Sequence, residues 1–200
     1  MYTIKKCENK KLAINDEAWG SAEVAVIDKI NWPDVEGLTP IPNTTAKILY
    51  NDYGIFVQLQ TDENPLLATK RVQNEAVCTD SCMEFFIRPN TDDDRYFNFE
   101  FNPFGTMYLG FRTGRYDCVN IPETKQVFSV ISDVGEKLWT LQFTIPFEII
   151  HKYFGKHTDV MMGNLYKCGN VKHYATYYPI KTEEPDYHRP EYFGEFVLEK

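Results

Sequence analysis

Residues 96–105 read YFNFEFNPFG, and polar and apolar side chains alternate in this stretch up to its proline. Alternation of this kind is typical of a β-strand, because successive side chains point to opposite faces of a sheet. We expect the apolar set to be buried in a core: Phe97, Phe99 and Phe101. The other face carries a row of polar side chains, whose role the rest of the sequence must explain: Tyr96, Asn98, Glu100 and Asn102.

Strand-like patterns recur along most of the chain. Residues 46–50 and 55–61 flank Asn51-Asp52-Tyr53-Gly54, which is a typical hairpin turn. Further runs predict strands at residues 24–30, 82–88, 106–111, 126–132, 138–145, 160–166, 174–179 and 194–198. A proline in the first position predicts one short helix at residues 146–154.

Many short strands at near-regular spacing favour an all-β fold. We predict a two-sheet antiparallel β-sandwich of jelly-roll-like form, as a single domain over residues 1–200. Trp32 is flanked by Asn31 and Pro33 and is expected to be exposed. Apolar side chains of the neighbouring strands are expected to join the core: Val57, Leu59, Phe85 and Ile87.

Composition limits the classes of partner. The chain is 43% hydrophobic and 25% charged, as in ordinary globular proteins, and its net charge is -8. Nucleic acids and anionic membranes are bound through basic surfaces, so neither is an expected partner. No apolar run approaches the roughly 18–20 residues that span a bilayer. A neutral ligand remains compatible with this charge.

The N-terminal residues lack the apolar segment of a signal peptide. Five cysteines, an odd number, agree with free thiols in a reducing compartment. We therefore expect a cytoplasmic protein, or a secreted one if the natural chain starts earlier.

Two short segments carry residue types that bind metals. Asp92, Asp93 and Asp94 offer the oxygen ligands that Ca²⁺ prefers, although such a run is also typical of a solvated turn. Cys78 and Cys82 could point to zinc, but the sequence offers no second pair at zinc-site spacing. We therefore interpret the two cysteines as small residues at the start of a strand, and expect no cofactor other than calcium.

The strand at residues 82–88 places Glu84 and Arg88 on one face. If it neighbours residues 96–102, these side chains share a polar surface with Asn98 and Glu100. Three interpretations follow. Two nearby carboxylates suit glycoside hydrolysis, the row could be a solvated and charge-paired sheet face, and carboxylate, amide and guanidinium groups also suit sugar hydroxyls.

The order of motifs resembles carbohydrate-binding module family 9, within the wider DOMON-like β-sandwich group. The resemblance extends over nearly the whole chain in the right order: Asn15-Asp16-Glu17-Ala18-Trp19, KILYNDYGIFVQLQTDEN, DSCMEFFIRP, YFNFEFNPFG, LWTLQFTIPFEII and YHRPEYFGEFVLE. It implies that Trp19 and Trp139 are core residues. It also implies an oligo- or polysaccharide ligand such as a glucan or xylan chain end, and a glycoside hydrolase as a partner.

Family members hold a terminal sugar between two tryptophans, and the resemblance places those positions at Cys78 and Tyr187. It assigns the sugar-binding strand glutamate to Glu84, and a basic contact falls near Asn98 or Glu100. Tyr177, Tyr178 and Tyr116 could supply a substitute aromatic platform or could be packing residues. His188 and Arg189, beside Tyr187, could contact the ligand or fix the loop.

Three classes of function are compatible with these residues. We favour a non-catalytic carbohydrate-binding module, because short strands leave little room for a hydrolytic cleft with two tuned carboxylates. A glycosidase is the enzymatic alternative. A haem-binding DOMON module is the third, with methionine and histidine ligands, but the sequence pairs no histidine with Met83, Met107, Met161 or Met162.

Overall fold

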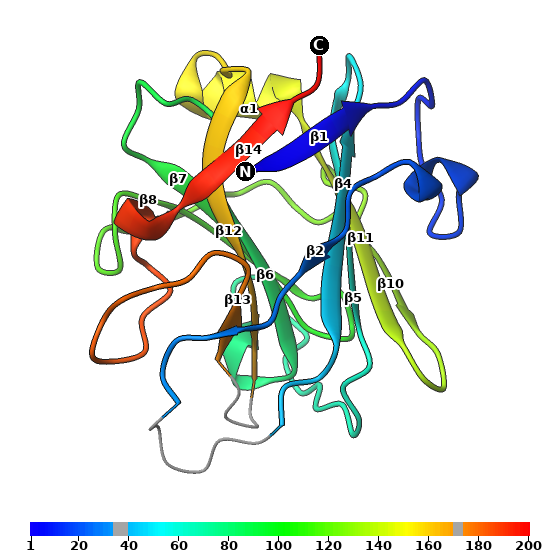
Figure 1. Ribbon diagram of the computed structural model, residues 1–200, viewed down its shortest axis with the longest axis vertical. Helices are drawn as coiled ribbons and strands as arrows, with labels where there is room; N and C mark the ends of the chain where they lie inside the picture. The colour runs from blue at the N-terminus through cyan, green and yellow to red at the C-terminus, as the bar shows by residue number, and fades with distance from the viewer. Residues whose placement is uncertain (34–39, 170–173) are drawn as a thin grey trace.

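The computed structural model describes residues 1–33, 40–169 and 174–200, and strands make up most of its regular secondary structure (Figure 1). The strands are β1 (Tyr2–Lys6), β2 (Ala25–Val26), β3 (Lys29–Ile30), β4 (Thr44–Tyr50), β5 (Gly54–Thr61), β6 (Cys82–Arg88), β7 (Tyr96–Phe101), β8 (Met107–Arg112), β9 (Cys118–Asn120), β10 (Ile131–Val134), β11 (Trp139–Pro146), β12 (Val160–Cys168), β13 (Ala175–Thr176) and β14 (Gly194–Leu198). The described helices are α1 (Phe147–Phe154) and the 3-10 turns η1 (Glu17–Gly20), η2 (Val77–Thr79) and η3 (Pro190–Tyr192).

The strands form a single curled sheet in the order β10-β11-β5-β4-β1-β14-β12-β6-β7-β8-β9. Its two arms face each other, because the Phe99 and Phe101 rings on β7 lie 5.2 and 4.7 Å from the Phe143 ring on β11. The all-β prediction is confirmed. The expectation of purely antiparallel strands is wrong at β1, which runs parallel to both β4 and β14.

The space between the two arms holds the main core. Every apolar side chain that the alternation assigned to the core is fully buried: Val57, Leu59, Phe85, Ile87, Phe97, Phe99 and Phe101. Trp19 and Trp139 are also buried, as expected. Met83, Met107 and Met161 lie in this core too.

Several local predictions need correction. The run at residues 24–30 forms two short strands, β2 and β3, and the chain turns at residues 125–129 before β10 begins. The expectation that Trp32 is exposed is wrong, because its ring is 4% exposed. The Trp32 indole donates a hydrogen bond to the Thr182 carbonyl (2.8 Å) and packs against Tyr174 and Tyr187.

The helix prediction is confirmed at α1, which buries Phe147, Ile150 and Phe154 against the core. It ends at Gly155, whose φ of 74° favours glycine. Among the described residues, no helix is long and apolar enough to cross a membrane.

The polar face of β7 is buried as well. Tyr96 and Asn98 are fully buried and Glu100 is 6% exposed. The chain between β13 and β14 covers this face and forms a second apolar cluster with it: Trp32, Val77, Cys82, Phe86, Tyr96, Tyr166, Cys168, Ile180, Tyr187 and Phe193. A solvated, charge-paired sheet face is therefore the wrong interpretation of the polar row.

Candidate ligand-binding cavity

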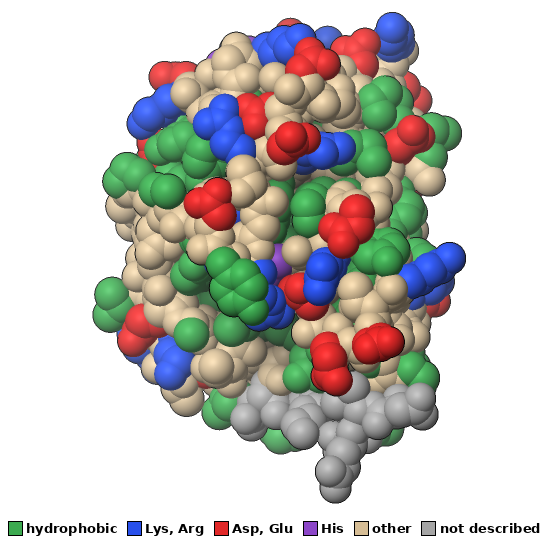
Figure 2. Space-filling view, turned by 90° about the vertical axis from the view of Figure 1, so that its left-hand side faces the viewer, with side chains coloured by type: hydrophobic (Ala, Val, Ile, Leu, Met, Phe, Trp, Pro, Cys, Tyr) green, Lys and Arg blue, Asp and Glu red, His purple; other side chains and the backbone are tan. Residues whose placement is uncertain are grey.

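A cavity of about 260 Å³ opens between the outer face of β6 and β7 and the loops that cover it. Figure 2 shows the side of the molecule on which β7 and β8 lie, where acidic and basic side chains surround a hollow. The cavity is lined by Cys78, Glu84, Glu100, Arg115, Cys168, Gly169, Tyr174, Pro185, Asp186, Tyr187 and His188.

Two carboxyl groups form the floor of the cavity. Glu84 on β6 and Glu100 on β7 are register partners in the antiparallel pair, so their side chains leave the sheet on the same face. Burial raises the pKa of both carboxyl groups well above the usual range, and the neighbouring Glu84 raises the pKa of Glu100 further. The buried carboxyl oxygens of the floor can therefore accept hydrogen bonds from hydroxyl groups or contact a cationic group.

A relay of hydrogen bonds orients Glu100. The Asn98 amide donates to the Glu100 carboxyl (2.6 Å) and accepts from the Arg112 guanidinium (2.6 Å). Gly110 lies opposite Asn98 on β8, and a Cβ there would come within 2.2 Å of the Asn98 side-chain oxygen. Glycine at position 110 therefore leaves space for the Asn98 side chain and its hydrogen bonds.

One wall of the cavity is a loop held by an ion cluster. Asp186 receives hydrogen bonds from Arg115 (2.9 Å) and the His188 backbone N–H (3.0 Å), and Arg189 pairs with it at 2.8 Å. The His188 ring stacks on Phe86, with centroids 4.9 Å apart, and its Nδ1 lies 3.0 Å from the Tyr96 hydroxyl. Burial and the nearby Arg112 and Arg115 lower the pKa of His188 to about 3, so it is neutral at ordinary pH.

Tyr187 contributes an aromatic wall but is itself 9% exposed. One face of its ring stacks on Tyr166 with centroids 4.3 Å apart. Its hydroxyl donates to the Lys167 carbonyl (3.0 Å) and also reaches the Ala175 carbonyl (3.3 Å). Tyr174 is more exposed and stands edge-on to Tyr187, so it adds a second aromatic side chain to the cavity.

The structure brings together part of the predicted site. Glu84, Glu100, Tyr187, His188 and Cys78 line the cavity, and Asn98 supports its floor.

Other predicted site residues lie elsewhere. Arg88, at the far end of β6, is not among the lining residues, and its guanidinium is 3.9 Å from Asp94. Tyr177 and Tyr178 pack against Phe196, with Tyr177 also against Tyr2, which agrees with the packing alternative.

The aspartates proposed for calcium do not form a cluster of metal-binding oxygens in the described part of the chain. Asp92 pairs with Lys156 at 2.6 Å, and Asp93 pairs with Arg95 at 2.5 Å. Asp94 points to Arg88 and is nearly fully exposed.

Sequence reasoning missed several lining and supporting residues: Arg112, Arg115, Cys168, Tyr174 and Asp186. Cys168 faces the cavity because it is the register partner of Cys82, and this pairing carries no local sequence signal. The loop residues Arg115 and Asp186 meet only in the folded chain.

Comparisons with solved structures agree on the fold. A presumed carbohydrate-binding protein from Bacteroides uniformis is 24% identical, with a TM-score of 0.84 and 98% of each chain covered. A family 9 carbohydrate-binding module from Caldicellulosiruptor kristjanssonii in complex with glucose is 11% identical, with a TM-score of 0.67, covering 98% of this chain and 94% of that one. The module from the same organism in complex with cellotriose is 12% identical, with a TM-score of 0.64, covering 98% and 92%.

A search among curated proteins finds no match. The profile described as "Carbohydrate-binding family 9" matches residues 14–198, which is nearly the whole chain. This match includes every residue that lines the cavity. The chain belongs to carbohydrate-binding family 9, a family of non-catalytic binding modules.

Proposed function

We propose that the cavity binds the terminal residue of a glucan or xylan oligosaccharide. The observation that carries the proposal is the pair of buried carboxyl groups, Glu84 and Glu100, at the base of a cavity walled by tyrosines. Carboxyl oxygens and the neutral imidazole of His188 can hydrogen-bond sugar hydroxyls, while the rings of Tyr174 and Tyr187 offer apolar surface to the pyranose. Related modules solved with glucose and with cellotriose support this ligand class.

The size of the cavity favours one sugar ring over a chain segment. Pockets for drug-sized ligands start at about 300 Å³, and this cavity measures about 260 Å³. We therefore expect recognition of a chain end, with further sugar residues projecting out of the cavity.

Two finer proposals follow from the same reasoning. The two arms of the curled sheet would act as the layers of a jelly-roll-like sandwich, with the cavity on the outer face of one layer. A glycoside hydrolase would be the partner that produces or consumes the bound oligosaccharide.

Replacing Glu100 by alanine is expected to weaken binding of cellotriose or xylotriose roughly ten- to a hundredfold. The reason is that removing the carboxyl group leaves the sugar hydroxyl that it binds unsatisfied in a buried cavity, which costs about 1–3 kcal/mol. Glu136→Ala, at an exposed turn, is the matched control and should bind like wild type. Isothermal titration calorimetry of wild type and the two variants measures the affinities.

Equal affinities of wild type and Glu100→Ala would contradict the site. An absence of heat with every gluco- and xylo-oligosaccharide tested on wild type would contradict the ligand class. Because the pKa of Glu100 is raised by burial, its charged form destabilises the fold, so the alanine variant should remain folded.

A further inference from the structure

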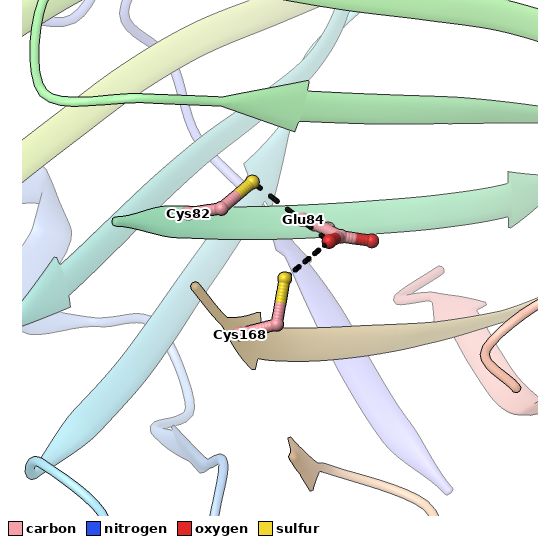
Figure 3. Close-up of side chains that lie close together, drawn as sticks. All are labelled: Cys82, Glu84 and Cys168. Atoms are coloured by element: carbon pink, nitrogen blue, oxygen red, sulfur yellow. Dashed lines mark hydrogen bonds between the residues drawn. The ribbon is translucent and has the colours of Figure 1, made fainter. Parts of the chain in front are cut away.

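Two thiols and one carboxyl group converge beneath the cavity, as Figure 3 shows for Cys82, Glu84 and Cys168. The Cys168 sulfur lies 2.8 Å from the Glu84 Oε1 atom, and the Cys82 sulfur lies 3.8 Å from the same atom. The three donor atoms all lie within 4.8 Å of one another. Cys82 is fully buried, Glu84 is 2% exposed and Cys168 is 6% exposed.

The backbone fixes this convergence. Cys82 and Glu84 are two residues apart on β6, so both side chains leave the same face of the sheet. Cys168 ends β12 as the register partner of Cys82 in the antiparallel pair. All three donors therefore stand on paired strands, which hold side chains more rigidly than loops do.

The donor set has a definite chemical preference. Zn²⁺ binds cysteine sulfur at about 2.3 Å and carboxylate oxygen at about 2.0–2.2 Å in a tetrahedral arrangement. Ligand atoms in such a site are about 3.3–3.8 Å apart. The Cys82 sulfur is at 3.8 Å from the Glu84 oxygen, at the upper end of this range, and the Cys168 sulfur at 2.8 Å would move outward to bind a metal. Hard cations such as Ca²⁺ take oxygen ligands alone, so two thiols exclude them.

We propose that Cys82, Glu84 and Cys168 bind a zinc-class divalent cation at the base of the cavity. Glu84 and Cys168 both line the cavity, so the fourth coordination position faces the space where the ligand enters. Cys78 also lines the cavity. A metal site is a property beyond sugar binding. It combines Cys82, from the Cys78–Cys82 segment, with Cys168, which lies 86 residues further along the sequence.

The polar and charged groups around the three donors contact one another. Glu84 has thiols as its hydrogen-bond partners, and Glu100 has the Asn98 amide. The buried ammonium of Lys167, next to Cys168, forms an ion pair with Glu63 at 2.7 Å. A divalent cation among the three donors would add positive charge between Glu84 and the thiols, where burial makes it most effective.

The test uses the full chain after reduction and removal of metal with a chelator. Titration with zinc alone should give one bound ion per chain. Titration with Co²⁺ should give the near-ultraviolet absorption of thiolate-to-cobalt charge transfer. Cys82→Ser and Cys168→Ser should each bind zinc at least tenfold more weakly than wild type. Cys7→Ser, at a buried cysteine in a different apolar cluster, is the matched control and should bind zinc normally.

Three results of the metal titrations would overturn the proposal. They are the absence of stoichiometric zinc binding by the wild type, cobalt spectra without charge-transfer absorption, and serine variants that bind like wild type. The first two need no variant to fold. Mass spectrometry showing that Cys82 and Cys168 pair as a disulfide, even with zinc present during reoxidation, would overturn it as well. A parallel cellotriose titration of the metal-free chain separates this outcome from a failure of sugar binding.

Discussion

Replacing Tyr187 by alanine is expected to lower the free energy of unfolding by about 3–5 kcal/mol, as for other large buried aromatic residues. The variant loses the stack on Tyr166 and leaves a void beside Trp32. It also leaves the Lys167 and Ala175 carbonyl groups without their hydroxyl donor. Urea denaturation followed by tryptophan fluorescence measures the loss.

Tyr187→Phe is the conservative partner of this variant. It keeps the ring and removes the hydroxyl, so we expect a loss of about 1 kcal/mol. Tyr116→Ala, at a side chain that is 96% exposed, should leave stability unchanged. A Tyr187→Ala protein as stable as wild type would show that the ring is a free platform, contrary to its packing here.

Replacing Asp80 by alanine is expected to lower the free energy of unfolding by about 3 kcal/mol or more. The Asp80 carboxylate is fully buried, and its removal leaves several hydrogen-bond donors without their acceptor. The Asp80 oxygens accept hydrogen bonds from the Thr69 backbone N–H (2.9 Å) and hydroxyl (2.6 Å), and from the Lys70 backbone N–H (2.9 Å). The Asn102 amide donates a further bond at 2.8 Å. Thermal and urea unfolding measure the loss, with exposed Asp52→Ala as the control.

The same carboxylate gives a pH dependence. Burial favours a raised pKa, but the bonds from Thr69, Lys70 and Asn102 outweigh it and hold the pKa of Asp80 below its usual value. Because the pKa of Asp80 is lower in the folded state, its carboxylate stabilises the fold at any pH above the unfolded pKa of about 3.9. This stabilisation is lost as the pH falls through the folded-state pKa. Asp80→Asn should therefore flatten the acid limb of the stability profile. An unchanged acid limb would contradict this assignment.

Strand alternation predicted the core well, because period-two patterning is local information. Phe97, Phe99 and Phe101 needed only their own spacing to be placed. The alternation also separated Asn98 and Glu100 from the phenylalanines, but it could not show what covers them. Their burial depends on the chain after β13, which packs across the sheet from a distant part of the sequence.

Sequence reasoning grouped the site residues of two strands that follow each other in the chain, and missed those that pairing with a distant strand brings in. Glu84 and Glu100 share a face by alternation alone once β6 and β7 are neighbours. Cys168 joins them only through the β6–β12 register, and a shift of one residue would turn it to the core. The Trp32 error has a similar origin, since a tryptophan beside a proline meets its partners Tyr174 and Tyr187 only in the folded chain.

The parallel strand β1 has a consequence for how the protein is made. It pairs Tyr2 with Phe196 on one side and Lys5 with Leu49 on the other, so it joins the two arms of the sheet. The pairing with β14 can form only after residue 198 has left the ribosome. Contacts so distant along the chain slow folding, because the loop entropy must be lost before they contribute. During synthesis, the arm that contains β4 and β5 therefore has an open edge at β1 until β14 has emerged. A chaperone that covers exposed strand edges should speed recovery of native protein.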